Sequence, residues 1–216
     1  MTFTAPVLSY SLLSPMLFLL AGALIGVLVE AFVSKAARPA VQLTVTLGAL
    51  LLALMQLWQI RGEQSLTAAM GSVVFDGPAA LLQASILIIA MISVFLIADG
   101  EHFAALPAAL PGSEEERQAI KSGNQITEVY PLTLFAVSGM LLFTVANDLI
   151  TLFVALEMLS LPLYLMAGLS RRRRLASQEA ALKYFLLGAF SSAFFLFGAA
   201  YLYGFSGSIS FAGMRE

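Results

Sequence analysis

The sequence predicts an all-α, polytopic membrane protein with six transmembrane helices. Of its 216 residues, 60% are hydrophobic and 11% are charged, and the mean hydropathy is +0.91. Soluble domains carry about 25% charged residues, so this composition indicates a chain that lies in a bilayer. A helix needs about 20 apolar residues to cross a membrane. The segments that meet or approach this length are residues 11–33, 41–60, 79–98, 130–146, 149–169 and 180–203.

The connections between these segments indicate how they are arranged. Only Asn147 and Asp148 separate the fourth segment from the fifth, which leaves room for a tight turn with an N-cap. Those two helices are therefore expected to be antiparallel neighbours.

The longest connection, residues 99–129, predicts a short surface helix. Ser113 and Glu116 have the spacing of a capping box, and Gly123 could end the helix. His102, in the same connection, is expected at the membrane surface, with a proton-relay role as the alternative.

The distribution of basic residues predicts the orientation. Basic residues concentrate in the loops after the first, third and fifth segments, eight against two on the other side. By the positive-inside rule, those loops face the cytoplasm and both termini lie on the outer, periplasmic side. The eight are Lys35, Arg38, Arg117, Lys121, Arg171, Arg172, Arg173 and Arg174, and the two are Arg61 and Arg215.

Several function classes are excluded by composition. The chain has no cysteine, which removes disulfides, thiolate metal sites and cysteine-ligated iron–sulfur clusters. A single histidine also excludes a bis-histidine haem. With a net charge of −2 and no aromatic-interleaved basic patch, nucleic-acid binding has no support. Any redox cofactor must therefore belong to another chain.

The most informative residue is Glu157, an acid within the apolar run LITLFVALEMLSLPLYLMAGL. An ionised side chain at the centre of a membrane helix costs about 3 kcal/mol, so its presence indicates a function. Ser160 and Tyr164 lie three and seven positions further and share its helix face. Pro162 frees the carbonyl of Met158 beside it. We expect Glu157 to take part in a proton relay or ion pathway, with a structural interhelical contact as the alternative.

Lys183 is the second candidate for the relay. It lies four residues after Glu179, the favoured spacing for a surface ion pair, and it is shallow enough to snorkel. At about 1.5 Å per residue, Glu157 lies roughly 12 Å deeper. A water-bridged link between Glu157 and Lys183 is therefore expected rather than a direct ion pair.

Other polar or small residues have simpler interpretations. Glu30, close to Lys35, and Gln83 are expected at the membrane interface. Gly188 and Ser192 form a pair of small residues that predicts a close helix contact without chemistry of its own.

Two stretches resemble a known family. The runs NDLITLFVALEMLSLPLYLMAG (Asn147–Gly168) and EAALKYFLLGAFSSAFFLFGAAYLYG (Glu179–Gly204) resemble the fifth and sixth membrane helices of the subunit N family of proton-pumping NADH:quinone oxidoreductase, respiratory complex I. The wider family includes the multisubunit cation/proton antiporters. The resemblance implies that Glu157 is the buried glutamate that takes part in proton translocation. It also implies that Lys183, in its KYF context, takes part.

The resemblance also predicts how the chain is divided. Residues 1–129 would hold three N-terminal transmembrane helices and a cytoplasmic loop with a short helix, and residues 130–216 would begin the first antiporter-like repeat. Family members continue with further helices, one of which carries the usual lysine partner. We therefore expect this chain to be the N-terminal portion of a longer subunit.

The function implied is that of a proton-translocating membrane-arm subunit of NADH:quinone oxidoreductase. The chain would be a multi-pass protein of the cell inner (plasma) membrane, within a hetero-oligomer of other membrane-arm subunits. It would hold no cofactor, since NADH, flavin, iron–sulfur clusters and quinone would bind partner subunits. The alternatives are a subunit of a cation/proton antiporter, distinguished by co-purifying subunits, and a non-catalytic scaffold, in which Glu157→Leu would be tolerated.

Overall fold

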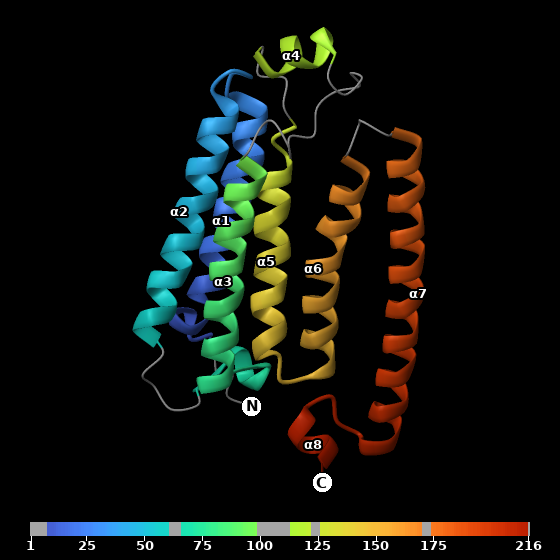
Figure 1. Ribbon diagram of the computed structural model, residues 1–216. Coiled ribbons are helices and arrows are strands. Elements are labelled where there is room, and N and C mark those ends of the chain that lie inside the picture. The colour runs from blue at the N-terminus through green and yellow to red at the C-terminus, as the bar shows by residue number, and fades with distance from the viewer. Residues whose placement is uncertain (1–7, 61–65, 99–112, 122–125, 170–173, 216) are drawn as a thin grey trace.

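A computed structural model describes residues 8–60, 66–98, 113–121, 126–169 and 174–215. Each of the six predicted apolar segments forms a helix, and these helices run side by side (Figure 1). They are α1 (Tyr10–Phe32), α2 (Arg38–Ile60), α3 (Gly77–Ala98), α5 (Val129–Val145), α6 (Leu149–Leu169) and α7 (Arg174–Ser206). Short helices lie at opposite ends of the bundle: α4 (Glu114–Lys121) at one and α8 (Phe211–Arg215) at the other.

The helices fit a membrane protein. Within the described ranges, five of them, α1, α2, α3, α6 and α7, are long and apolar enough to span a bilayer. The remaining long helix, α5, has 17 residues and is apolar but shorter. The helical, multi-pass class is therefore confirmed, whereas the sixth span, the outward termini and the division at residue 130 stay predictions.

Helix α4 agrees with the sequence prediction, whereas the start of α7 differs from it. The short surface helix is confirmed as α4, immediately after Ser113. His102 and Arg171–Arg173 lie outside the described residues. Helix α7 begins at Arg174, six residues before the predicted start at residue 180. Hydropathy did not indicate its first turns because they are polar. The hydroxyl of Ser177 joins these turns to the end of α6 by donating to the carbonyl of Ala167 at 2.7 Å.

A two-stranded sheet was not predicted. Strands β1 (Leu66–Ala68) and β2 (Val73–Phe75) pair antiparallel around a short 3₁₀ turn, η1 (Ala69–Gly71). The turn needs positive φ angles at Met70 (59°) and Gly71 (92°). Strands of three residues are too short to show an alternating pattern, which explains why the sequence did not indicate them.

The turn between α5 and α6 joins three parts of the chain. The backbone N–H of Asn147 donates to the carbonyl of Ser72 in the hairpin at 2.8 Å, and its own carbonyl accepts from the N–H of Phe211 at the start of α8 at 3.2 Å. Asp148 caps α6, because its Oδ1 accepts from the backbone N–H of Thr151 at 2.7 Å. The predicted tight, capped turn is confirmed.

The core lies among α1, α2, α3 and α5. Leu19, Leu50, Leu87 and Leu134, one from each helix, are fully buried there. Gln83 is also buried, and its amide donates to the carbonyl of Leu141 in α5 at 3.1 Å. The expectation that Gln83 lies at the membrane interface was wrong, because its side chain faces α5.

Glu30 is likewise not a simple interface residue. Its carboxylate accepts hydrogen bonds from Arg38 at 3.1 Å, from Gln42 at 2.7 Å and from the hydroxyl of Thr127. The Glu30 side chain is only 15% exposed. These four residues, here called the Glu30 cluster, join α1, α2 and the residues that lead into α5. The nearby lysine, Lys35, is not the partner that the structure provides.

Candidate functional site

Glu157 lies in the middle of α6, where that helix packs closely against α5. The contact depends on Gly139, since a Cβ at this position would lie 2.4 Å from the backbone nitrogen of Leu159 and 2.8 Å from the carbonyl carbon of Met158. No side chain larger than hydrogen fits between the two backbones. Gly139 therefore fixes the distance between α5 and the part of α6 that carries the acid.

The carboxylate of Glu157 faces α7. Its side chain is partly buried, and its Oε1 accepts a hydrogen bond from the hydroxyl of Ser192 in α7. Ser192 itself is 8% exposed. Within the described ranges, no basic side chain pairs with Glu157. The acid therefore lies between helices beside a neutral donor.

Ser160 and Tyr164, the polar residues predicted to share the helix face of Glu157, are buried on α6 but do not bond to Glu157. The hydroxyl of Ser160 donates to the carbonyl of Leu156 in its own helix. The ring of Tyr164 meets the edge of Tyr184 in α7 with a centroid distance of 4.7 Å. A Cβ at Gly188 would lie 1.8 Å from the Tyr164 hydroxyl, so this glycine permits the close approach of α7.

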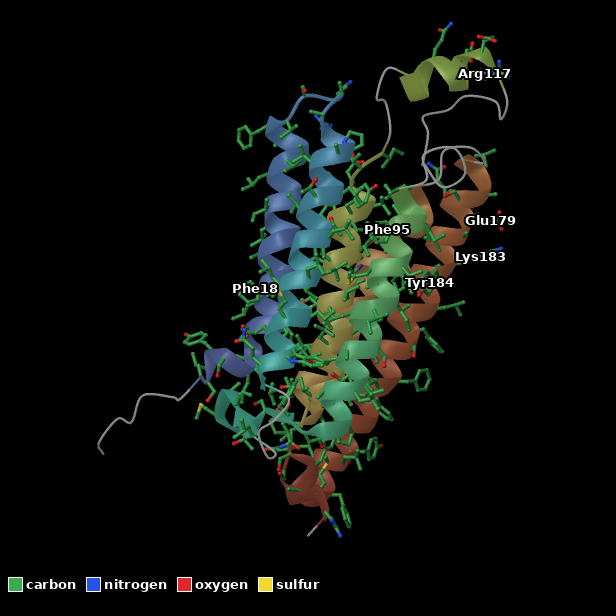
Figure 2. All side chains as sticks on the ribbon, turned by 60° about the vertical axis from the view of Figure 1, so that its left-hand side comes forward. Phe18, Phe95, Arg117, Glu179, Lys183 and Tyr184 are labelled. Atoms are coloured by element: carbon green, nitrogen blue, oxygen red, sulfur yellow. The ribbon has the colours of Figure 1, made fainter. Side chains whose placement is uncertain are left out.

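Lys183 lies on the outer side of α7. Its ammonium nitrogen is 2.5 Å from the carboxylate of Glu179, and both side chains are about two-thirds exposed, at 68% and 64%. Figure 2 shows both projecting away from the bundle. Ser192 lies nine positions after Lys183, and at about 100° per residue this places the two on opposite faces of α7. The predicted surface ion pair is confirmed. Among the described residues, Lys183 pairs with Glu179 and not with Glu157.

Ser192 is the contact that sequence reasoning missed. It was expected, with Gly188, to mark a close helix contact, and this contact is confirmed. Its donor role was not predicted, because nothing in the order of residues aligns position 192 of one helix with position 157 of another. The sequence did offer one signal for this role. Ser192 is a small residue on a predicted contact face, and a serine there places a hydroxyl group in the contact.

The described residues do not assemble a metal site. They contain no group of three or more histidine, cysteine, aspartate or glutamate side chains that could hold a metal ion. What the arrangement around Glu157 offers chemically is a carboxyl group that can gain or lose a proton.

The fold and the acid together define a class: multi-pass helical membrane proteins with a protonatable side chain inside the helix bundle. Comparison with known proteins agrees with this class. Residues 146–216, which include Glu157 and Ser192, match the family described as NADH:quinone oxidoreductase/Mrp antiporter, transmembrane.

Within this class, nearly the whole chain is similar to subunit N of NADH-quinone oxidoreductase. It is 53% identical to the subunit N of Thermobifida fusca, over 99% of this chain and 41% of the relative. It is 50% identical to that of Acidothermus cellulolyticus, over 96% of this chain and 41% of the relative. The chain thus spans about two-fifths of the length of these relatives. The resemblance predicted from the sequence is confirmed.

Solved structures show the same fold. A chain of respiratory complex I from Thermus thermophilus superposes with a TM-score of 0.68 and 33% identity, over 91% of this chain and 38% of that chain. A chain of the archaeal membrane-bound sulfane sulfur reductase gives a TM-score of 0.65 at 17% identity, over 92% of this chain and 28% of that one. The second likeness concerns the fold alone.

Proposed function

We propose that this chain is part of a proton-translocating membrane-arm subunit of NADH:quinone oxidoreductase, in which Glu157 gains and releases the proton. The observation that carries the proposal is the partly buried Glu157 carboxylate, which meets a neutral hydroxyl rather than a basic partner. An acid that is not locked into an ion pair can change protonation when the surrounding field changes. Similarity to subunit N proteins supports the same function.

The proposal includes the assembly. The chain would lie in the inner (plasma) membrane within a hetero-oligomer of other membrane-arm subunits. NADH oxidation and quinone reduction would occur in partner subunits that hold the flavin, the iron–sulfur clusters and the quinone. Energy from that chemistry would alter the field around Glu157 and so its affinity for a proton.

Lys183 belongs to the proposed relay through the family resemblance. The structure places its ammonium group in an exposed pair with Glu179. Any link from Lys183 to Glu157 would run through hydrated polar groups, because Lys183 lies on the face of α7 opposite to Ser192, which contacts Glu157.

The main test is Glu157→Gln in the assembled complex, since glutamine keeps the shape and cannot titrate. We expect the number of protons pumped per electron to fall, with assembly and electron transfer to quinone largely retained. The measurement is proton uptake or release by proteoliposomes that contain the purified complex. Unchanged pumping would exclude Glu157 as the proton carrier.

A second function, that of a cation/proton antiporter subunit, is favoured by the family description of residues 146–216, which names both classes. Purification of the native complex separates the two. Soluble flavin and iron–sulfur subunits would accompany an oxidoreductase, whereas an antiporter would exchange cations for protons without them.

A further inference from the structure

Ser192 is held at a fixed place on the α6–α7 contact. Toward the start of α7, Gly188 lies against the hydroxyl of Tyr164. Toward its end, the rings of Phe195 and Phe153 stack with a centroid distance of 5.8 Å. Ser192 lies between these two contacts, so packing on both sides determines where its hydroxyl points. Such preorganisation is what a residue that orients another side chain requires.

The two serines near Glu157 differ in what they do with their donor proton. A hydroxyl has one proton to donate. Ser160 donates it to the carbonyl of Leu156 in its own helix, whereas Ser192 donates across the interface to Glu157. Ser192 is therefore the hydroxyl that acts on the acid, and Ser160 is a matched serine that does not.

We propose that Ser192 is a positioning residue for Glu157. Its hydrogen bond holds the carboxylate in one orientation. Because hydrogen bonds to an ionised carboxylate are about twice as strong as those to neutral groups, it also makes the α6–α7 contact depend on the charge of Glu157. Ser192 thus couples proton loss at Glu157 to a tighter contact with α7. This role rests on the proposed function of Glu157 and adds a regulation of that same site.

The test compares three variants in the assembled complex: Ser192→Ala, Ser192→Thr and the control Ser160→Ala. The rate of proton pumping by proteoliposomes is measured across a range of pH, together with the number of protons pumped per electron. We expect Ser192→Ala to slow pumping by about tenfold, the order expected for losing a hydrogen bond to a charged group, and to move the pH profile. Ser192→Thr, which keeps the hydroxyl, restores most of the pumping and the normal profile. Ser160→Ala leaves both unchanged.

Each pumping rate is expressed per mole of assembled complex, so that a change in the yield of the complex does not affect the comparison. A normal rate and pH profile for Ser192→Ala would overturn the positioning role. A rate that falls equally in Ser192→Ala, Ser192→Thr and Ser160→Ala, with an unmoved pH profile, would also overturn it. Glu157→Gln is measured alongside. If that variant pumps normally, the proposed function itself fails, whereas impaired Glu157→Gln with a silent Ser192→Ala overturns only the inference about Ser192.

Discussion

Two membrane acids in this protein have opposite surroundings. Glu30 accepts hydrogen bonds from Arg38, Gln42 and Thr127, and so joins three parts of the chain. Glu157 accepts from Ser192. Among the residues that the structure describes, the first acid has a cationic partner and the second has none. Glu30 is therefore held by three side chains, one of them cationic, whereas Glu157 is held by one neutral hydroxyl.

The largest expected effect on stability comes from replacing Glu30 with leucine. Glu30→Leu removes the acceptor of three hydrogen bonds, one of them from a cation, and we expect a loss of about 3 kcal/mol, the lower end of the range for removing one partner of a buried ion pair. Arg38 is 22% exposed, which keeps the loss at that lower end. The measurement is the thermal midpoint and yield of the assembled complex.

Glu157→Leu is the matched control for this comparison. It removes the acceptor of one hydrogen bond, from the neutral hydroxyl of Ser192. We expect the stability to change by about 1 kcal/mol or less and pumping to be lost. If both leucine variants were equally stable, the distinction between a structural acid and a functional one would be wrong.

The next largest effect concerns the backbone beside Glu157. Gly139→Ala places a Cβ 2.4 Å from the backbone nitrogen of Leu159, and a backbone atom cannot rotate away. We expect a loss of about 1–3 kcal/mol, as for an overpacked core, together with weaker pumping as α6 shifts. Gly48→Ala, where nothing lies within 4 Å, is the control and is expected to keep stability and pumping. Equal effects of the two alanines would contradict this account of the α5–α6 contact.

A smaller effect is expected at the cap of α6. Asp148→Ala removes the acceptor of the Thr151 N–H and is expected to lower stability by about 1 kcal/mol, measured as the thermal midpoint. Asp148→Asn, which keeps a side-chain oxygen, is the control and should retain most of the stability. The hypothesis fails if alanine and asparagine behave alike.

The smallest effect on stability is expected at the exposed ion pair. Lys183→Gln and Glu179→Gln break the same pair from either side, and each is expected to change stability by at most about 0.5 kcal/mol. If Lys183 serves the relay, only Lys183→Gln lowers pumping. Identical pumping in both variants would remove Lys183 from the proposal and leave Glu157 as the sole titratable residue in it.

Hydropathy was enough to predict the six apolar helices, because each is a long run with few charges. It also singled out Glu157, since an acid inside such a run is conspicuous on its own. The capped turn at Asp148 was predictable for the same reason: caps are local, and the interacting residues lie three positions apart.

Contacts between distant residues could not be predicted in this way. Glu30 and Thr127 are 97 positions apart, and Glu157 and Ser192 are 35 apart. Which donor meets which acid depends on how each helix is rotated about its axis. The hydrophobic pattern of a membrane helix specifies that rotation weakly, because lipid-facing and protein-facing sides are both apolar. The same holds for Lys183. Helix geometry shows that it lies opposite to Ser192, but only the structure shows that Ser192 is on the face of α7 that contacts α6.

The turn at Asn147 has a mechanical consequence for Glu157. Backbone hydrogen bonds join this turn to both the hairpin and α8, so the adjoining end of α6 has a firm anchor. A rod fixed at one end tilts about that end. Glu157 lies about 12 Å along α6 from Leu149, so a tilt of about 5° would carry the acid sideways by about 1 Å, enough to exchange one hydrogen-bond partner for another.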